Sequence, residues 1–336
     1  MHKHRLLAAV IALSLFCVSS AQPRSGAGLE LAVSFVPKAA EIAYLSNWSG
    51  VIDDLRRVYP IEPVVGDNDF LRALSDRHAA AAQFAVSGRS PWFMHEMWAW
   101  SLLDLDWELQ VYPGGAVLAF NSGFDPGPTL ALLDERGYQA SDHHGQVTRH
   151  IAFDLSLAWL RPPLAEYTNV AYLEQERVLV VASTLEALHA LLDAQAGRSE
   201  AWSAADIGLA VAGAAEPPLG AWVFPAATAC RYMLVDEPGL QAYSAAAIAY
   251  HRVGDEIVGT AVLAYDSEVA PALDLEARTS FATDDESAFR SGDYFQSLTA
   301  EIVGEMLWLR FGELDRSSRM FDMFNRSALP FLRCTG

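Results

Sequence analysis

The pattern of hydrophobic and polar positions changes period several times along the chain. Short apolar or alternating runs predict strands, and longer runs with apolar residues three and four apart predict helices. A strand is expected over residues 40–48 and a helix over 49–59, with Ser49 or Asn47 as its N-cap. A second helix is expected over 67–88, and a third over 90–107, where a Ser-Pro pair provides a start signal.

One arrangement of elements recurs in the rest of the chain. Residues 114–137, 177–197 and 256–278 each predict a strand followed by a helix. Further strands at 169–176 and 245–256 precede the second and third copies through short polar turns, which indicates antiparallel hairpins. We therefore expect an α+β fold of antiparallel sheets with helices on one face, built as two related strand-hairpin-strand-helix lobes.

The beginning of the chain has the layout of a secretory signal peptide. Lys3 and Arg5 provide a basic start, an apolar run follows, and small residues lead to Ala21, after which we expect cleavage. An uncleaved anchor is the alternative, but the apolar run is shorter than the roughly 20 residues that span a bilayer. Cys17 follows Phe16, whereas a lipoprotein signal needs a small residue there. We expect an exported, soluble protein of bacterial type, secreted or periplasmic, with no membrane insertion after cleavage.

Composition and charge narrow the function classes. The predicted division is a signal peptide at 1–21, a first lobe at 29–200 and a second lobe at 201–336. The chain is 52% hydrophobic and only 19% charged, as in folded proteins, and its net charge is −19. That charge repels phosphates, so we do not expect nucleic acid as a partner.

Two cysteines remain after the expected signal cleavage, Cys230 and Cys334. An even pair in an oxidising compartment is more often a disulfide than two free thiols. We therefore predict a bond between them.

Three histidines lie close together in the sequence at a predicted hairpin. His144 and Gly145 suit its tight turn, because glycine tolerates positive φ. His143 and His150 are then four positions apart along the ladder, or about 13 Å. The three imidazoles cannot share one zinc ion in that register. Asp142 and His144 could still act together at the tip, or bind a metal with help from elsewhere in the chain, but we favour a solvated turn and assign no metal or cofactor.

Other motifs of catalysis fail or are ambiguous. His95-Glu96 lacks the second histidine of a zinc-protease helix, because Ala99 stands there. Asp104, Asp106 and Glu108 alternate without the spacing of a calcium loop. A paired-carboxylate hydrolase stays open, but an acidic solvent face is the commoner explanation. No Gly-x-Ser-x-Gly elbow, phosphate loop or Cys-x-x-Cys pair is found in the sequence, so no catalytic residue is assigned.

A short set of motifs resembles a group of known sequences. The motifs are Gly123-Phe124-Asp125, then Gly137-Tyr138, then Gly145. A run of this kind before a hairpin resembles uncharacterised exported bacterial proteins with a GFD…GY…G run. The resemblance covers about a third of the chain. It implies a scaffold and no particular activity.

The most unusual segment, residues 92–107, is aromatic. Its members are Trp92, Phe93, Met97, Trp98, Trp100 and Trp107. A helix that is apolar all round is usually buried in a core. The functional interpretation is a contact surface, since aromatic residues and Met are favoured at such sites.

These observations lead to a hypothesis of function. We expect an exported non-enzymatic binding protein that contacts a small hydrophobic ligand or an envelope protein through the aromatic segment. The alternatives are an exported hydrolase with a site assembled from scattered residues, or a structural partner in an envelope complex.

Overall fold

The structure is a computed structural model of the chain. It describes residues 31–59, 64, 67–89, 94–95, 98–152, 167–202, 217–233, 236–237, 239–283, 297–314, 317–325 and 329–335. The expected signal peptide lies outside the described residues.

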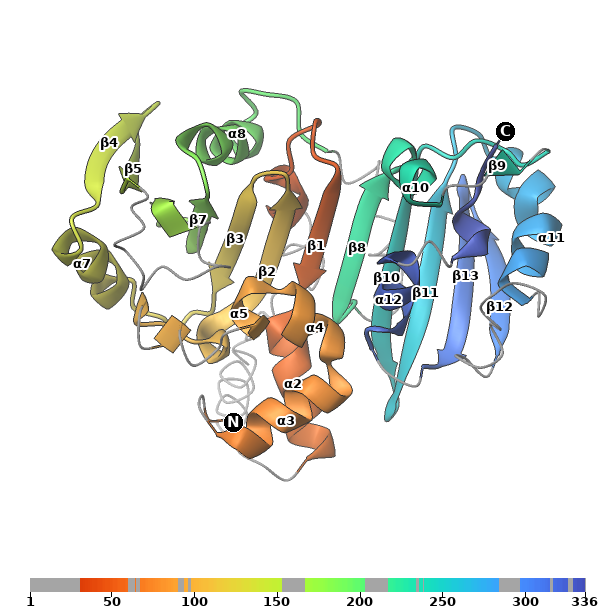
Figure 1. The fold of residues 1–336 in the computed structure, drawn as a ribbon, viewed down its shortest axis with the longest axis horizontal. Helices are drawn as coiled ribbons and strands as arrows, with labels where there is room; N and C mark the ends of the chain where they lie inside the picture. The colour runs from red at the N-terminus through yellow and green to blue at the C-terminus, as the bar shows by residue number, and fades with distance from the viewer. Residues whose placement is uncertain are drawn as a thin grey trace, which may run out of the picture.

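One antiparallel sheet of twelve strands runs along the molecule, in the order β12-β13-β11-β10-β8-β1-β2-β3-β7-β6-β5-β4 (Figure 1). Its strands are β1 (Ile42–Ser46), β2 (Leu105–Tyr112), β3 (Gly115–Phe120), β4 (Gln139–His143), β5 (Gln146–His150), β6 (Asn169–Leu173), β7 (Val178–Ala182), β8 (Gly220–Pro225), β10 (Ala245–Val253), β11 (Glu256–Ala264), β12 (Leu298–Val303) and β13 (Met306–Glu313). A separate parallel pair joins β9 (Asp236–Glu237) to β14 (Cys334–Thr335). The predicted α+β fold with antiparallel pairing is confirmed.

The helices of the described residues are mostly short. They are α2 (Trp48–Val58), α3 (Asn68–Arg77), α4 (Ala79–Phe84), α5 (Val86–Arg89), α7 (Gly127–Glu135), α8 (Leu185–Gln195), α10 (Ala226–Met233), α11 (Ala270–Thr283) and α12 (Arg319–Asn325), with 3₁₀ turns at Leu102–Asp104 and Pro330–Leu332. The start of α2 is local in origin, because the Asn47 side chain accepts a hydrogen bond from the N–H of Gly50 at 3.0 Å.

The sheet is continuous between the two predicted lobes. Strand β1 pairs with β8 at four positions, from Ala43 opposite Val223 to Ser46 opposite Gly220. The strands of the first predicted lobe lie on one side of this pairing and those of the second lobe on the other (Figure 1). The division into lobes at 29–200 and 201–336 stays a prediction.

Two hydrophobic cores lie on opposite faces of the sheet. Tyr44 points to the larger core, where it meets residues of α2 to α5 and α12. Its neighbour Leu45 points to the second core, which contains Leu188, Leu191 and Leu192 of α8. Helices α2 to α5 and α12 therefore cover one face of the sheet, and α8 packs on the other, whereas the sequence predicted helices on one face.

Two predicted helices differ from the structure. The helix expected over 67–88 is divided into α3, α4 and α5, with a break at His78, whose φ and ψ are −116° and 47°. The helix expected over 90–107 has given way to strand by Leu105, where β2 begins. His78 contacts the Asp54 carboxylate at the first break, and β2 pairs with β1 and β3 at the second, so tertiary contacts override the local helical pattern at both places.

Candidate functional site

The histidine hairpin, residues 139–150, has the predicted register. Gln139 lies opposite His150, and His143 lies opposite Gln146. The turn residues His144 and Gly145 have φ values of 55° and 85°. His150 is thus at the far end of the hairpin from His143, as expected.

Helix α8 brings two further side chains to the hairpin. The helix begins after Thr184, whose side chain accepts a hydrogen bond from the N–H of Ala187 at 3.1 Å. Its buried leucines fix one side of the helix on the sheet. His189 and Asp193 are four residues apart, so they lie on one face of the helix. That face meets His143 of the hairpin.

We call His143, His144, His189 and Asp193 the histidine cluster. His143 Nε2 and Asp193 Oδ1 are 2.9 Å apart. The rings of His143 and His189 are stacked, with centroids 3.7 Å apart and planes 9° apart. The His144 ring is 4.5 Å from the His143 ring. One ligand atom each from His143, His144 and Asp193 lies within 4.8 Å of the others.

The cluster contains an ionised carboxylate and at least one neutral imidazole. Burial tends to raise the pKa of Asp193, but hydrogen bonds from Arg198 and His143 lower it more, so the net change is downward. Burial lowers the pKa of His189, and the neighbouring His143 lowers it further. Within the described part of the chain, the buried Nε2 of His189 has no hydrogen-bond partner.

A cleft of about 710 Å³ opens beside these side chains, and we call it the histidine cleft. Its lining includes His143, His189 and Asp193, together with Glu186 and Glu200, which are exposed. The lining carries three carboxylates against one lysine, Lys38. This balance favours a positively charged ligand.

The described tryptophans of the aromatic segment are buried and do not line the histidine cleft. Trp98, Trp100 and Trp107 are only 1%, 0% and 9% exposed. Trp98 packs against Tyr167 with ring centroids 4.6 Å apart. These three rings are core residues, so a ligand could reach them only if the core opened. Trp92, Phe93 and Met97 lie outside the described residues.

The expected acidic solvent face is wrong for one of its carboxylates. Glu108 is 1% exposed and accepts hydrogen bonds from the indole N–H of Trp48 at 3.2 Å and the backbone N–H of Val86 at 2.6 Å. Asp104 caps a 3₁₀ turn through Ser101. Glu108 thus joins α2 and α5 to the sheet.

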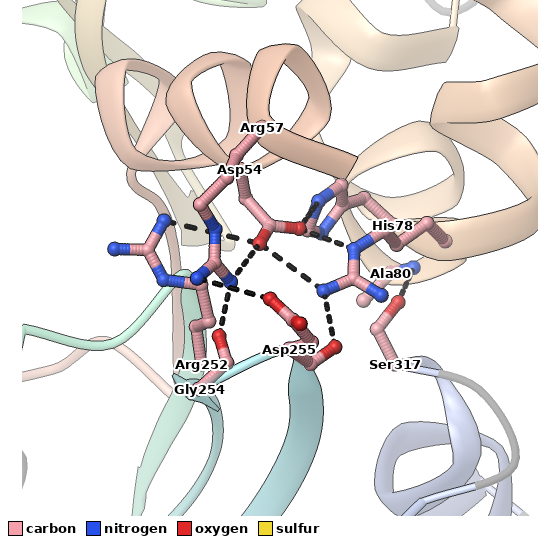
Figure 2. Close-up of polar contacts among 9 residues, drawn as sticks. Asp54, Arg57, His78, Ala80, Arg252, Gly254, Asp255 and Ser317 are labelled. Atoms are coloured by element: carbon pink, nitrogen blue, oxygen red, sulfur yellow. Dashed lines mark hydrogen bonds and ion pairs between the residues drawn. The ribbon is translucent and has the colours of Figure 1, made fainter. Parts of the chain in front are cut away.

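A second polar cluster surrounds Asp54 of α2 (Figure 2). Asp54 and His78 are both fully buried, and His78 Nε2 is 2.9 Å from the carboxylate. Arg77 also binds this carboxylate, while Arg57 and Arg252 lie 3.5 and 3.8 Å from it. Because Arg252 belongs to β10, the cluster joins α2 and α3 to strands of the other half of the sheet. With both central groups shielded from solvent, its role is structural.

Each of the two buried groups has a lowered pKa. Burial tends to raise the pKa of Asp54, but hydrogen bonds from His78 and Arg77 lower it well below its usual range. Burial lowers the pKa of His78, and this outweighs the opposite influence of Asp54. The carboxylate is therefore ionised and the imidazole is neutral near pH 7.

Comparisons with known proteins give no family. No protein-family model and no curated protein matches the chain. Crystal form I of TP0453 has a TM-score of 0.36 and 8% identity, over 88% of this chain and 96% of that chain. Crystal form III has a TM-score of 0.40 and 8% identity, over 89% and 97%. Crystal form IV has a TM-score of 0.41 and 11% identity, over 87% and 96%. Scores this low carry no argument about this chain.

Two further points concern the sequence motif and the helices. The resemblance to exported proteins with a GFD…GY…G run stays a prediction. In the part of the chain that the structure describes, no helix has both the length and the apolar character needed to cross a membrane.

Proposed function

We propose that this chain is an exported, non-enzymatic binding protein that holds a small cation in the histidine cleft. The observation that carries the proposal is that His143 and Asp193 line the cleft together with Glu186 and Glu200. His144 lies beside His143 and Asp193, with its donor atom within 4.8 Å of theirs. A chain of net charge −19 also attracts cations over longer distances.

Export is supported by two features. Residues 1–21 have the layout of a signal peptide. Cys230 and Cys334 form a disulfide, a bond that persists in oxidising compartments. Contact of a hydrophobic ligand or an envelope protein with Trp92, Phe93 and Met97 stays a separate prediction.

Native mass spectrometry of protein purified from the exported fraction of its own host tests the proposal. We expect a bound mass beyond the polypeptide. Ala190 lines the cleft, so Ala190→Trp should fill it and remove that mass. Leu273→Trp is the matched control, because Leu273 is 64% exposed on α11 and should leave the bound mass unchanged. A bound mass that survives Ala190→Trp, or none in the wild type, would contradict the proposal.

A further inference from the structure

The histidine cluster has the composition and spacing of an incomplete metal coordination shell. Zinc binds imidazole nitrogen and carboxylate oxygen at about 2.0–2.2 Å, so two donors of one tetrahedral ion are about 3.4 Å apart. The donor atoms of His143, His144 and Asp193 are within 4.8 Å of one another. Shifts of about 1 Å, which side-chain rotation supplies, would bring them to ligand spacing.

The turn explains why two neighbouring histidines can act together. Consecutive side chains on a strand point to opposite faces, which would separate His143 from His144. His144 instead occupies the left-handed region, with φ of 55°, at the first position of the turn. Its ring therefore lies beside His143, with centroids 4.5 Å apart.

Asp193 can bind a cation through Oδ2. Both hydrogen bonds to Asp193, from His143 and from Arg198, go to Oδ1 at 2.9 and 2.7 Å. Oδ2 is the oxygen that a cation can approach without displacing Arg198. A cation bound to His143 Nε2 and Asp193 Oδ2 replaces the proton that Nε2 now donates to Oδ1, and this proton is released to solvent.

His189 is a positioning residue and not a ligand in this arrangement. A metal ligand must point its lone pair at the ion in the plane of its own ring. The His189 and His143 planes are only 9° apart at 3.7 Å, so the two rings cannot both point at one ion. Stacking on His189 instead holds the orientation of His143.

We propose that His143, His144 and Asp193 bind one divalent transition-metal ion of the zinc class. This inference rests on the proposed function and names its ligand. Imidazole donors suit Zn²⁺, Cu²⁺ and Ni²⁺, whereas Ca²⁺ and Mg²⁺ take oxygen ligands. Three protein ligands leave one tetrahedral position for water or a small ligand from the cleft.

Calorimetric titration of tag-free, chelator-treated protein without residues 1–21 with ZnCl₂ tests the proposal. We expect one zinc ion per chain, and at least a 100-fold weaker affinity in His143→Ala/His144→Ala and in Asp193→Asn. His150→Ala is the matched control, because His150 lies at the other end of the same hairpin, and it should bind zinc as the wild type does. CaCl₂ should give no stoichiometric binding.

Several results would overturn the metal site. The first is the absence of stoichiometric zinc binding by the wild type, and the second is equal zinc affinity in the wild type and the double variant. The third is a loss of zinc affinity in His150→Ala as large as that in the double variant. If the double variant fails to fold, Co²⁺ titration of the wild type replaces it. We then expect visible bands of a four- or five-coordinate ion with nitrogen and oxygen ligands, and their absence would also refute the site.

The two proposals fail in different ways. An organic bound mass that Ala190→Trp removes, together with no zinc binding, overturns the metal site and leaves the binding function standing. Zinc binding in vitro, with no ligand in the cleft of host-purified protein, leaves the metal site and overturns the proposed function.

Discussion

At the scale of single residues, one buried carboxylate connects parts of the chain that are far apart in sequence. Asp54 is fully buried and makes its closest contacts with Arg77 and His78. Removing one partner of a buried ion pair leaves the other charge uncompensated, at a cost of about 3–5 kcal/mol. We expect Asp54→Asn to lower the free energy of unfolding by about that amount at pH 7, measured by urea denaturation.

The neighbouring residue provides the control for this prediction. The side chain of Asp53 is 70% exposed and lies 3.5 Å from Arg56, so Asp53→Asn should cost less than about 1 kcal/mol.

Because Asp54 has a lowered pKa in the folded protein, its stabilisation is present above the unfolded value, about 3.9, and is lost as the pH falls below it. The difference in the free energy of unfolding between wild type and Asp54→Asn should therefore become smaller in acid. Equal effects of the two substitutions at pH 7 would refute the role of the cluster.

Glu108 shows why sequence alone misplaced a buried acid. Asp104, Asp106 and Glu108 alternate in the sequence, which predicts one shared strand face. The pairing of β2 with β3 shifts register between Leu105 and Trp107, so the alternation does not continue through the segment. Gln110 is a local partner of Glu108, but the donors on Trp48, Val86 and Ser87 come from positions 21 to 60 residues away. No local pattern shows that these N–H groups are available.

At the scale of elements, the structure agrees with the sequence at the histidine hairpin, where the signal is a tight turn, but not at the two predicted helices that are broken. The register of the histidine hairpin follows from a turn of two residues, His144 and Gly145. The spacing of His189 and Asp193 is also a local signal, because residues four apart on a predicted helix lie on one face. That α8 lies against the hairpin depends on how both pack on the sheet, which periodicity does not determine. The hairpin of the candidate site could therefore be predicted from the sequence, but its contact with α8 could not.

The aromatic segment allows a prediction at this same scale. Trp98 and Trp100 are 1% and 0% exposed, in the larger core. Truncating a buried Trp to Ala costs about 3–5 kcal/mol, so we expect each substitution to destabilise the protein by that amount and the double variant to unfold. Urea denaturation followed by circular dichroism measures this. Leu273→Ala, at a 64% exposed position, should have little effect. A double variant that folds with nearly unchanged stability would restore the surface interpretation of these two rings.

At the scale of the whole molecule, the disulfide and the continuous sheet together determine how the chain unfolds. The predicted bond between Cys230 and Cys334 is confirmed, with a Cα–Cα distance of 5.5 Å and a sequence separation of 104. It attaches β14 to α10, while β14 also pairs with β9. In the chain-entropy model, a loop of this length contributes roughly 4.7 kcal/mol.

The position of this bond makes the predicted lobes testable. Both cysteines belong to the second predicted lobe, 201–336, yet β1 pairs with β8 and the Asp54 cluster reaches Arg252 across the boundary. We therefore expect the sheet to unfold as one unit. Calorimetry of Cys230→Ser/Cys334→Ser should show a single transition at a lower temperature, and a thiol assay on unreduced, denatured wild type should read near zero. Two transitions, of which only one moves in the variant, would show that the lobes unfold independently. Two titratable thiols per wild-type chain would show that the bond does not form.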